Sequence, residues 1–76
     1  MIHQGYTYDY WLDDDGDVRK RWHEIRRPDG TTVEWDLMTP EFRSWSPYSE
    51  PSRAVFEQCV EHVRFFDFIG VDNKVN

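Results

Sequence analysis

The first half of the chain alternates apolar and polar residues with a period of two. The alternating runs are residues 5–12, 18–26 and 31–38. Clusters rich in Asp, Gly and Pro separate these runs at 13–17 and 28–30. A period of two is typical of half-buried strands, and such clusters are typical of turns. The pattern therefore predicts a three-stranded antiparallel meander over residues 5–38.

The last third of the chain has a helical pattern instead. Ser49 or Ser52 is a suitable cap, and Pro51 fits a first helical turn. Apolar residues then recur at spacings of three and four, namely Val55, Phe56, Cys59, Val60, Val63 and Phe66. This spacing makes one apolar stripe on a helix. We expect a helix over about residues 52–67, ending before Gly70, that covers the sheet face carrying Tyr6, Tyr8, Tyr10, Val33, Trp35 and Leu37.

Residues 39–50 between these parts predict an irregular loop with one helical turn, capped by Thr39 and begun by Pro40. Trp45 and Tyr48 are expected to fold over the edge of the core. The predicted architecture is a single α+β domain over residues 1–76: a three-stranded antiparallel β-sheet with one C-terminal α-helix packed on one face, followed by a short tail.

Three apolar residues near the end, Phe65, Phe68 and Ile69, do not fit the helical stripe. Two interpretations remain open. Either the helix ends near Phe66 and the tail folds back on the core, or these residues form an exposed apolar patch. Exposed patches on small proteins usually mark interaction sites. A patch here is a candidate surface for a protein partner or for a second copy of the chain.

Charge is spread unevenly along the chain. The net charge is −6, yet residues 18–27 hold five bases and one acid. An acidic chain has little general affinity for nucleic acids or anionic membranes. We expect one outer face of the sheet to carry Trp11, Arg19, Arg21 and His23. Tryptophan and arginine dominate protein-binding hot spots, so this face predicts a protein-binding surface, with Asp9, Glu34 and Asp36 expected across from the arginines.

No pattern predicts catalysis or a cofactor. Asp13, Asp15, Asp17 and Glu24 resemble the spacing of an EF-hand loop, but Val18 stands where that loop needs glycine. Cys59 and His62 supply two ligands, whereas a structural zinc site usually needs four. Neither a nucleophile elbow nor a glycine-rich phosphate loop is present. We therefore expect no enzyme activity, no metal and no cofactor.

The sequence as a whole predicts a small acidic module that binds a protein partner, in the manner of phage-encoded viral inhibitors or regulators that occlude a site on a host protein. A single cysteine and the absence of a membrane-length apolar run predict a cytoplasmic location. The alternative is a nucleic-acid-binding sheet that uses the basic second strand. In outline, the order of strands and helix resembles the three-stranded DNA-binding domains of some integrases and plant transcription factors.

Overall fold

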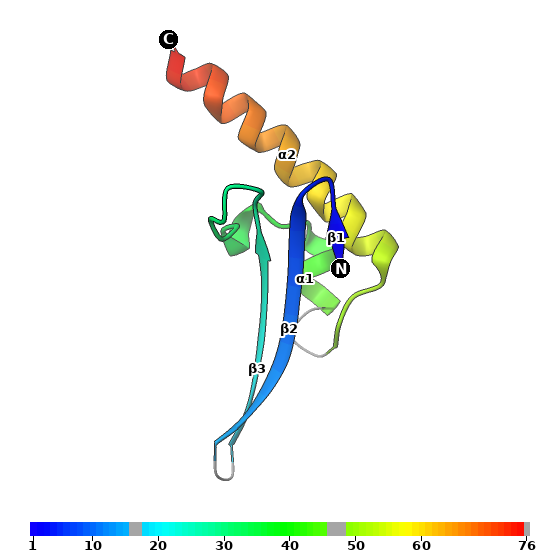
Figure 1. The fold of residues 1–76 in the computed structure, drawn as a ribbon. Coiled ribbons are helices and arrows are strands. Elements are labelled where there is room, and N and C mark those ends of the chain that lie inside the picture. Colours follow the sequence, from blue (N-terminus) through cyan, green and yellow to red (C-terminus); the bar gives the residue numbers. More distant parts are fainter. Residues whose placement is uncertain (16–17, 46–48, 76) are drawn as a thin grey trace.

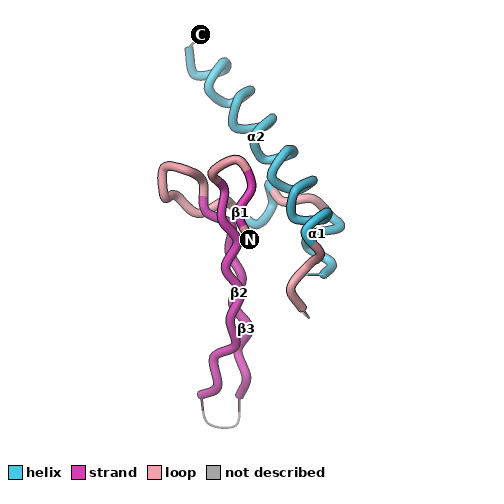
Figure 2. Tube along the Cα trace, turned by 45° about the vertical axis from the view of Figure 1, so that its right-hand side comes forward, coloured by secondary structure: helices cyan, strands magenta, loops and turns pink. Residues whose placement is uncertain are grey.

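The computed structural model describes residues 1–15, 18–45 and 49–75, with side chains described outside residues 11–22 and 71–76. It is an α+β structure, in which a three-stranded antiparallel sheet is packed against a C-terminal helix (Figure 1). Figure 2 shows that both α-helices lie on the same side of the sheet. The predicted fold class is therefore confirmed.

The sheet has the order β1–β2–β3, with β1 at Ile2–His3, β2 at Tyr6–Asp15 and β3 at Val18–Arg26. Gln4 and Gly5 connect β1 to β2 with positive φ angles of 51° and 84°. Two successive positive φ angles suit a two-residue hairpin turn, and glycine adopts them without steric cost. The two long strands match the first two predicted runs.

The predicted third strand over residues 31–38 is wrong. Thr32 forms an isolated bridge with Arg26, and a 3-10 turn, η1, then occupies Trp35–Leu37. The backbone N–H of Leu37 donates to the carbonyl of Glu34 at 3.0 Å, so backbone hydrogen-bonding groups of this segment pair within the segment. Alternation over so few residues does not distinguish a strand from a short turn. The third strand of the sheet is instead β1, at the start of the chain.

The predicted turn at Thr39 and Pro40 is confirmed as helix α1, Pro40–Trp45. The hydroxyl of Thr39 accepts a hydrogen bond from the backbone N–H of Phe42 at 3.2 Å, which satisfies one of the free donors at a helix start. Phe42 is completely buried. Trp45 is 51% exposed, so it does not cover the core as expected. Tyr48 lies outside the described residues.

Helix α2 spans Arg53–Val75, and its predicted end near residue 67 is wrong. Ser52 caps it by accepting a hydrogen bond from the N–H of Val55 at 3.2 Å. Gly70 does not stop the helix, because it keeps a negative φ angle and glycine tolerates the helical conformation at a modest cost. The tail therefore does not fold back. Figure 1 shows the C-terminal part of α2 extending past the end of the sheet.

The core lies between α2 and the covered face of the sheet. Its buried members are Tyr6, Tyr8, Ile25, Val33, Met38, Phe42, Val55, Phe56, Cys59, Val60 and Val63. The ring centroids of Tyr8 and Phe56 lie 5.9 Å apart, so the predicted contact between strand and helix is present. Trp35 was expected in this core but is 43% exposed, because η1 turns it away.

Candidate interaction surface

The aromatic face of α2 consists of Phe65, Phe66 and Phe68. Their side chains are 60%, 43% and 66% exposed, respectively. The rings of Phe65 and Phe66 touch edge to face at 5.8 Å. Ile69, which was predicted with them, is half-buried. Of the two interpretations of this segment, the exposed patch is the one that the structure supports.

Phe65 and Phe68 are exposed because they lie off the apolar stripe with which α2 packs on the core. Among the residues of α2 whose side chains are described, Val63 is the last that is fully buried. Phe66 continues the same apolar stripe but is only partly buried. Its ring contacts the ring of His62 at 4.7 Å. Phe65 and Phe68 line an open hollow of about 400 Å³ together with Glu61 and Arg64.

An ion-pair network anchors α2 beside the aromatic face. The guanidinium of Arg27 donates from Nε to Asp67 Oδ2 at 2.8 Å and from Nη2 to Oδ1 at 3.1 Å. The hydroxyl of Tyr6 donates to the same carboxylate at 3.1 Å. Arg27 also donates to Glu34 at 2.8 Å and to the carbonyl of Thr32 at 3.0 Å. This network ties the loop after β3 to the helix.

The pKa values of the network follow from these contacts. The hydrogen bond to Asp67 raises the pKa of Arg27 above its ordinary value. The hydrogen bond from Arg27 lowers the pKa of Glu34. Burial, followed by the hydrogen bond to Asp67, raises the pKa of Tyr6. Near neutral pH the network therefore holds a charged guanidinium, an ionised Glu34 and a neutral phenol.

A groove lies between the loop after β3 and α2. It measures about 500 Å³ and is lined by Arg27, Asp29, Thr31, Thr32, Glu34, Phe66, Asp67 and Gly70. We call it the Gly70 groove. Asp29 accepts hydrogen bonds from the N–H and the hydroxyl of Thr31, at 2.9 and 2.7 Å, and these lower the pKa of its carboxyl. Because Phe66 lines the groove and touches Phe65, the groove is continuous with the aromatic face.

The residues predicted to share an outer sheet face do not share one. The strand register pairs Trp11 with Trp22 and Tyr10 with His23. Directly paired residues lie on the same side of a sheet, and successive residues alternate. Trp11 therefore lies in a different row from His23, and from Arg19 and Arg21, which share the parity of His23. The side chains of Trp11, Arg19 and Arg21 are outside the described set.

The acids predicted to oppose the basic strand are also different ones. Asp9 is in register with Glu24, and Glu34 binds Arg27 instead. Asp36 lies in η1 rather than in a strand. The register places Asp14 across from Arg19 and Asp13 across from Lys20. The register thus pairs each of these two bases with an acid.

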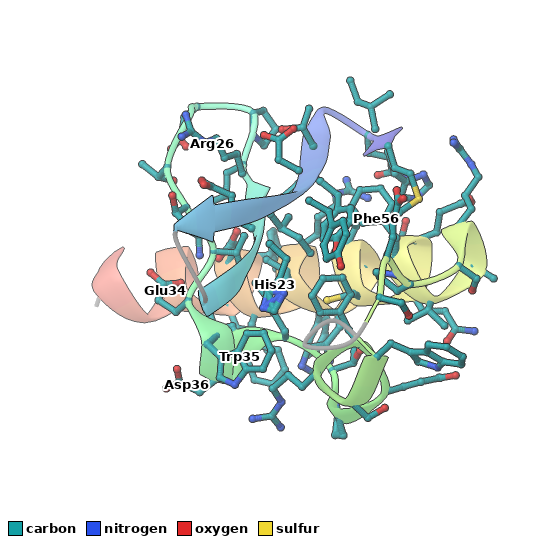
Figure 3. All side chains as sticks on the ribbon, turned by 90° about the horizontal axis from the view of Figure 1, so that it is seen from below. His23, Arg26, Glu34, Trp35, Asp36 and Phe56 are labelled. Carbon is teal, nitrogen blue, oxygen red and sulfur yellow. The ribbon has the colours of Figure 1, made fainter. Side chains whose placement is uncertain are left out.

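His23 belongs to a different contact from the one predicted. Its ring stacks on Trp35 with a centroid distance of 5.1 Å and an angle of 12° between the planes (Figure 3). Burial lowers the pKa of His23. Stacking on a half-exposed tryptophan links β3 to η1.

Comparison with known proteins adds no further assignment. No family model matches the chain, and searches of curated proteins and of solved structures found no match. Among the described residues, no three His, Cys, Asp or Glu side chains are grouped to hold a metal ion. In that same part of the chain, no helix has both the length and the apolar character needed to cross a membrane.

Sequence reasoning missed Arg27, Asp67 and Gly70 as parts of this surface, and it assigned Phe66 to the core. Arg27 and Asp67 are 40 residues apart, so no local pattern connects them. The partial exposure of Phe66 could have been predicted, because Phe66 is the last member of the apolar stripe of the helix. Gly70 carried a signal that pointed to a helix end instead.

Proposed function

We propose that this protein is a protein-binding module whose partner docks on the aromatic face of α2. The observation that carries the proposal is the exposure of Phe65, Phe66 and Phe68 on one stretch of helix. Burying one phenylalanine side chain contributes about 1.5–3 kcal/mol. A small protein that leaves three of them about half exposed forgoes part of that stabilisation, and contiguous apolar patches of this kind mark interaction sites.

The anchoring network supports the same proposal. Asp67 lies between Phe66 and Phe68 in the sequence and is held by Arg27 and Tyr6. A held helix presents its rings in a fixed arrangement, so binding a partner costs less conformational entropy. The fitting mode is a helix laid into an apolar groove of the partner. Binding of this kind would let the module act as an inhibitor or regulator that occludes a site on its partner.

The net charge of −6 favours a partner other than a second copy of the chain. Two chains of net charge −6 repel each other, whereas a neutral or basic partner does not. The described structure also contains a buried, free thiol at Cys59. A single cysteine cannot form a disulfide within the chain, which suits a reducing compartment, and we propose a cytoplasmic location.

The test compares two substitutions of exposed aromatic residues. The double variant Phe65→Ala/Phe68→Ala removes most of the aromatic face. Trp45→Ala removes a ring of similar exposure on α1 and serves as the matched control. Proteins captured from the native cell by the wild type are identified by mass spectrometry, and the affinity of each purified partner is measured for all three baits. We expect the double variant to bind at least about 2 kcal/mol more weakly and the control to bind normally.

Three results would count against the proposal. Equal binding by the double variant would show that the aromatic face is not the docking surface. Retention that nuclease abolishes, with affinity that falls steeply as salt rises, would favour the nucleic-acid alternative. Sedimentation velocity that shows dimers dependent on Phe65 and Phe68 would assign the face to a second copy of the chain.

A further inference from the structure

Gly70 is a glycine that packing does not require. It lies inside α2, where glycine is among the least favourable residues for helix stability. A Cβ atom built on it meets nothing within 4 Å. An alanine would therefore fit and would strengthen the helix. The consequence of having glycine here is that the Gly70 groove stays open beside Phe66 and Asp67.

The charge lining this groove is negative. Its wall contains three carboxylates, those of Asp29, Glu34 and Asp67, and one guanidinium, that of Arg27. The formal charges, −3 and +1, sum to −2. All three nitrogens of the Arg27 guanidinium donate hydrogen bonds within the protein. The groove therefore offers little to an anion and is complementary to a cation.

Phe66 adds an apolar surface at the same place. Its ring is 43% exposed and lines the groove. A cation close to the face of an aromatic ring is attracted by the ring's quadrupole. Lysine and arginine side chains combine an apolar stem with a charged head, so the stem can lie on the ring while the head reaches carboxylates.

We propose that the Gly70 groove receives a lysine or arginine side chain of the partner that docks on the aromatic face. This inference rests on the proposed function and specifies the chemistry of the partner. Apolar residues of the partner cover Phe65 and Phe68, and a neighbouring cationic residue enters the groove past Phe66. The contact between the rings of Phe65 and Phe66 makes the two sites one continuous surface.

The groove is tested first without any partner. Isotope-labelled protein is titrated with n-butylguanidinium chloride, with n-butanol and with inorganic phosphate, and backbone amide shifts are followed by NMR. We expect n-butylguanidinium to shift the amides of Thr32, Phe66 and Gly70 more strongly than n-butanol does at equal concentration. Equal shifts from n-butanol, or shifts of the same amides by phosphate, would overturn the inference.

Two variants sharpen this measurement. Gly70→Leu fills the groove and should abolish the shifts caused by n-butylguanidinium, while Ala54→Leu, at an exposed position on the same helix, should leave them unchanged. Glu34→Gln removes one negative charge and should weaken n-butylguanidinium binding about threefold, the effect of a charge roughly 6 Å away in a water-like medium. Unchanged shifts in both groove variants would contradict the assignment.

The partner-level measurement separates this inference from the proposed function. Gly70→Leu should weaken partner binding at least about tenfold, which is an ordinary loss for one interface contact. If Gly70→Leu binds the partner normally while Phe65→Ala/Phe68→Ala does not, the groove inference fails and the proposed function stands. If the double variant also binds normally, the proposed function fails as well.

Discussion

The anchoring network makes a quantitative prediction for the substitution Asp67→Asn. The carboxylate of Asp67 accepts two hydrogen bonds from Arg27 and one from Tyr6. Asparagine keeps the shape of the side chain but removes its charge and replaces one acceptor oxygen with a donor amide. That amide meets donors of Arg27 or Tyr6 in either orientation, so at least one of the three hydrogen bonds is lost.

The expected loss of stability lies between the values for exposed and buried ion pairs. Exposed pairs contribute about 0–1 kcal/mol, and breaking a buried pair costs about 3–5 kcal/mol. The side chains of Arg27 and Asp67 are 16% and 29% exposed. Arg27 also keeps Glu34 as a partner, so its charge is not left uncompensated. We therefore expect Asp67→Asn to lower the free energy of unfolding by about 1–3 kcal/mol.

Urea denaturation monitored by circular dichroism measures this loss. The matched control is Glu57→Gln, which breaks the ion pair of Glu57 with Arg53, a residue that is 62% exposed on the same helix. That pair has i,i+4 spacing, and its loss should cost about 0.3–0.5 kcal/mol. Equal losses in the two variants would refute the conclusion that Arg27 and Asp67 anchor α2, because the contacts of Asp67 would then contribute no more than an exposed pair.

Three further predictions address the core and the His23 contact. Phe56→Ala should cost about 3–5 kcal/mol in urea denaturation, while Phe65→Ala should change stability by less than about 0.5 kcal/mol; similar costs would show that burial is misassigned. Tyr8→Phe should unfold at an equal or higher urea concentration, because the buried hydroxyl has no hydrogen-bond partner among the described residues; a clear drop in the midpoint would reveal one. Burial lowers the pKa of His23 in the folded state, so the unfolded state binds more protons. The stability that neutral His23 contributes is therefore present above the unfolded pKa of about 6.5 and is lost as pH falls below it. His23→Gln should reduce this loss of stability at low pH, and an unchanged profile of stability against pH would contradict the assignment.

Local patterns predicted the parts of the fold that local interactions determine. The long strands, the Thr39 cap and the buried stripe of α2 each follow from residues close together in sequence. The third strand was misplaced because β1 is two residues long, too short to show any alternation. Residues 31–38 alternate more clearly, but their backbone is satisfied within η1 and by contacts with β3.

The interaction surface was predicted in part, and the missing part depends on tertiary contacts. Phe65, Phe68 and Ile69 were recognised as misfits of the helical stripe, but their exposure depended on where α2 ends. Gly70 could not decide this, because glycine is compatible with both a helix end and a helix interior. The grouping of Trp11 with His23 differs from the strand register, which pairs Trp11 with Trp22 and Tyr10 with His23. A shift of one residue moves a side chain to the other face.

The anchor at Asp67 also determines how the aromatic face is presented. Successive residues of an α-helix are about 100° apart around its axis. With Asp67 turned toward Arg27, Phe66 and Phe68 flank it at about 100° on either side, and Phe65 lies about 160° away, facing outward. Phe66, on the flank facing the loop, lines the Gly70 groove, whereas Phe65 and Phe68 share the hollow with Glu61 and Arg64. Because the Arg27 contacts fix the rotation of the helix, Phe65 is the ring that connects the hollow at Phe68 with Phe66 and the negatively charged groove.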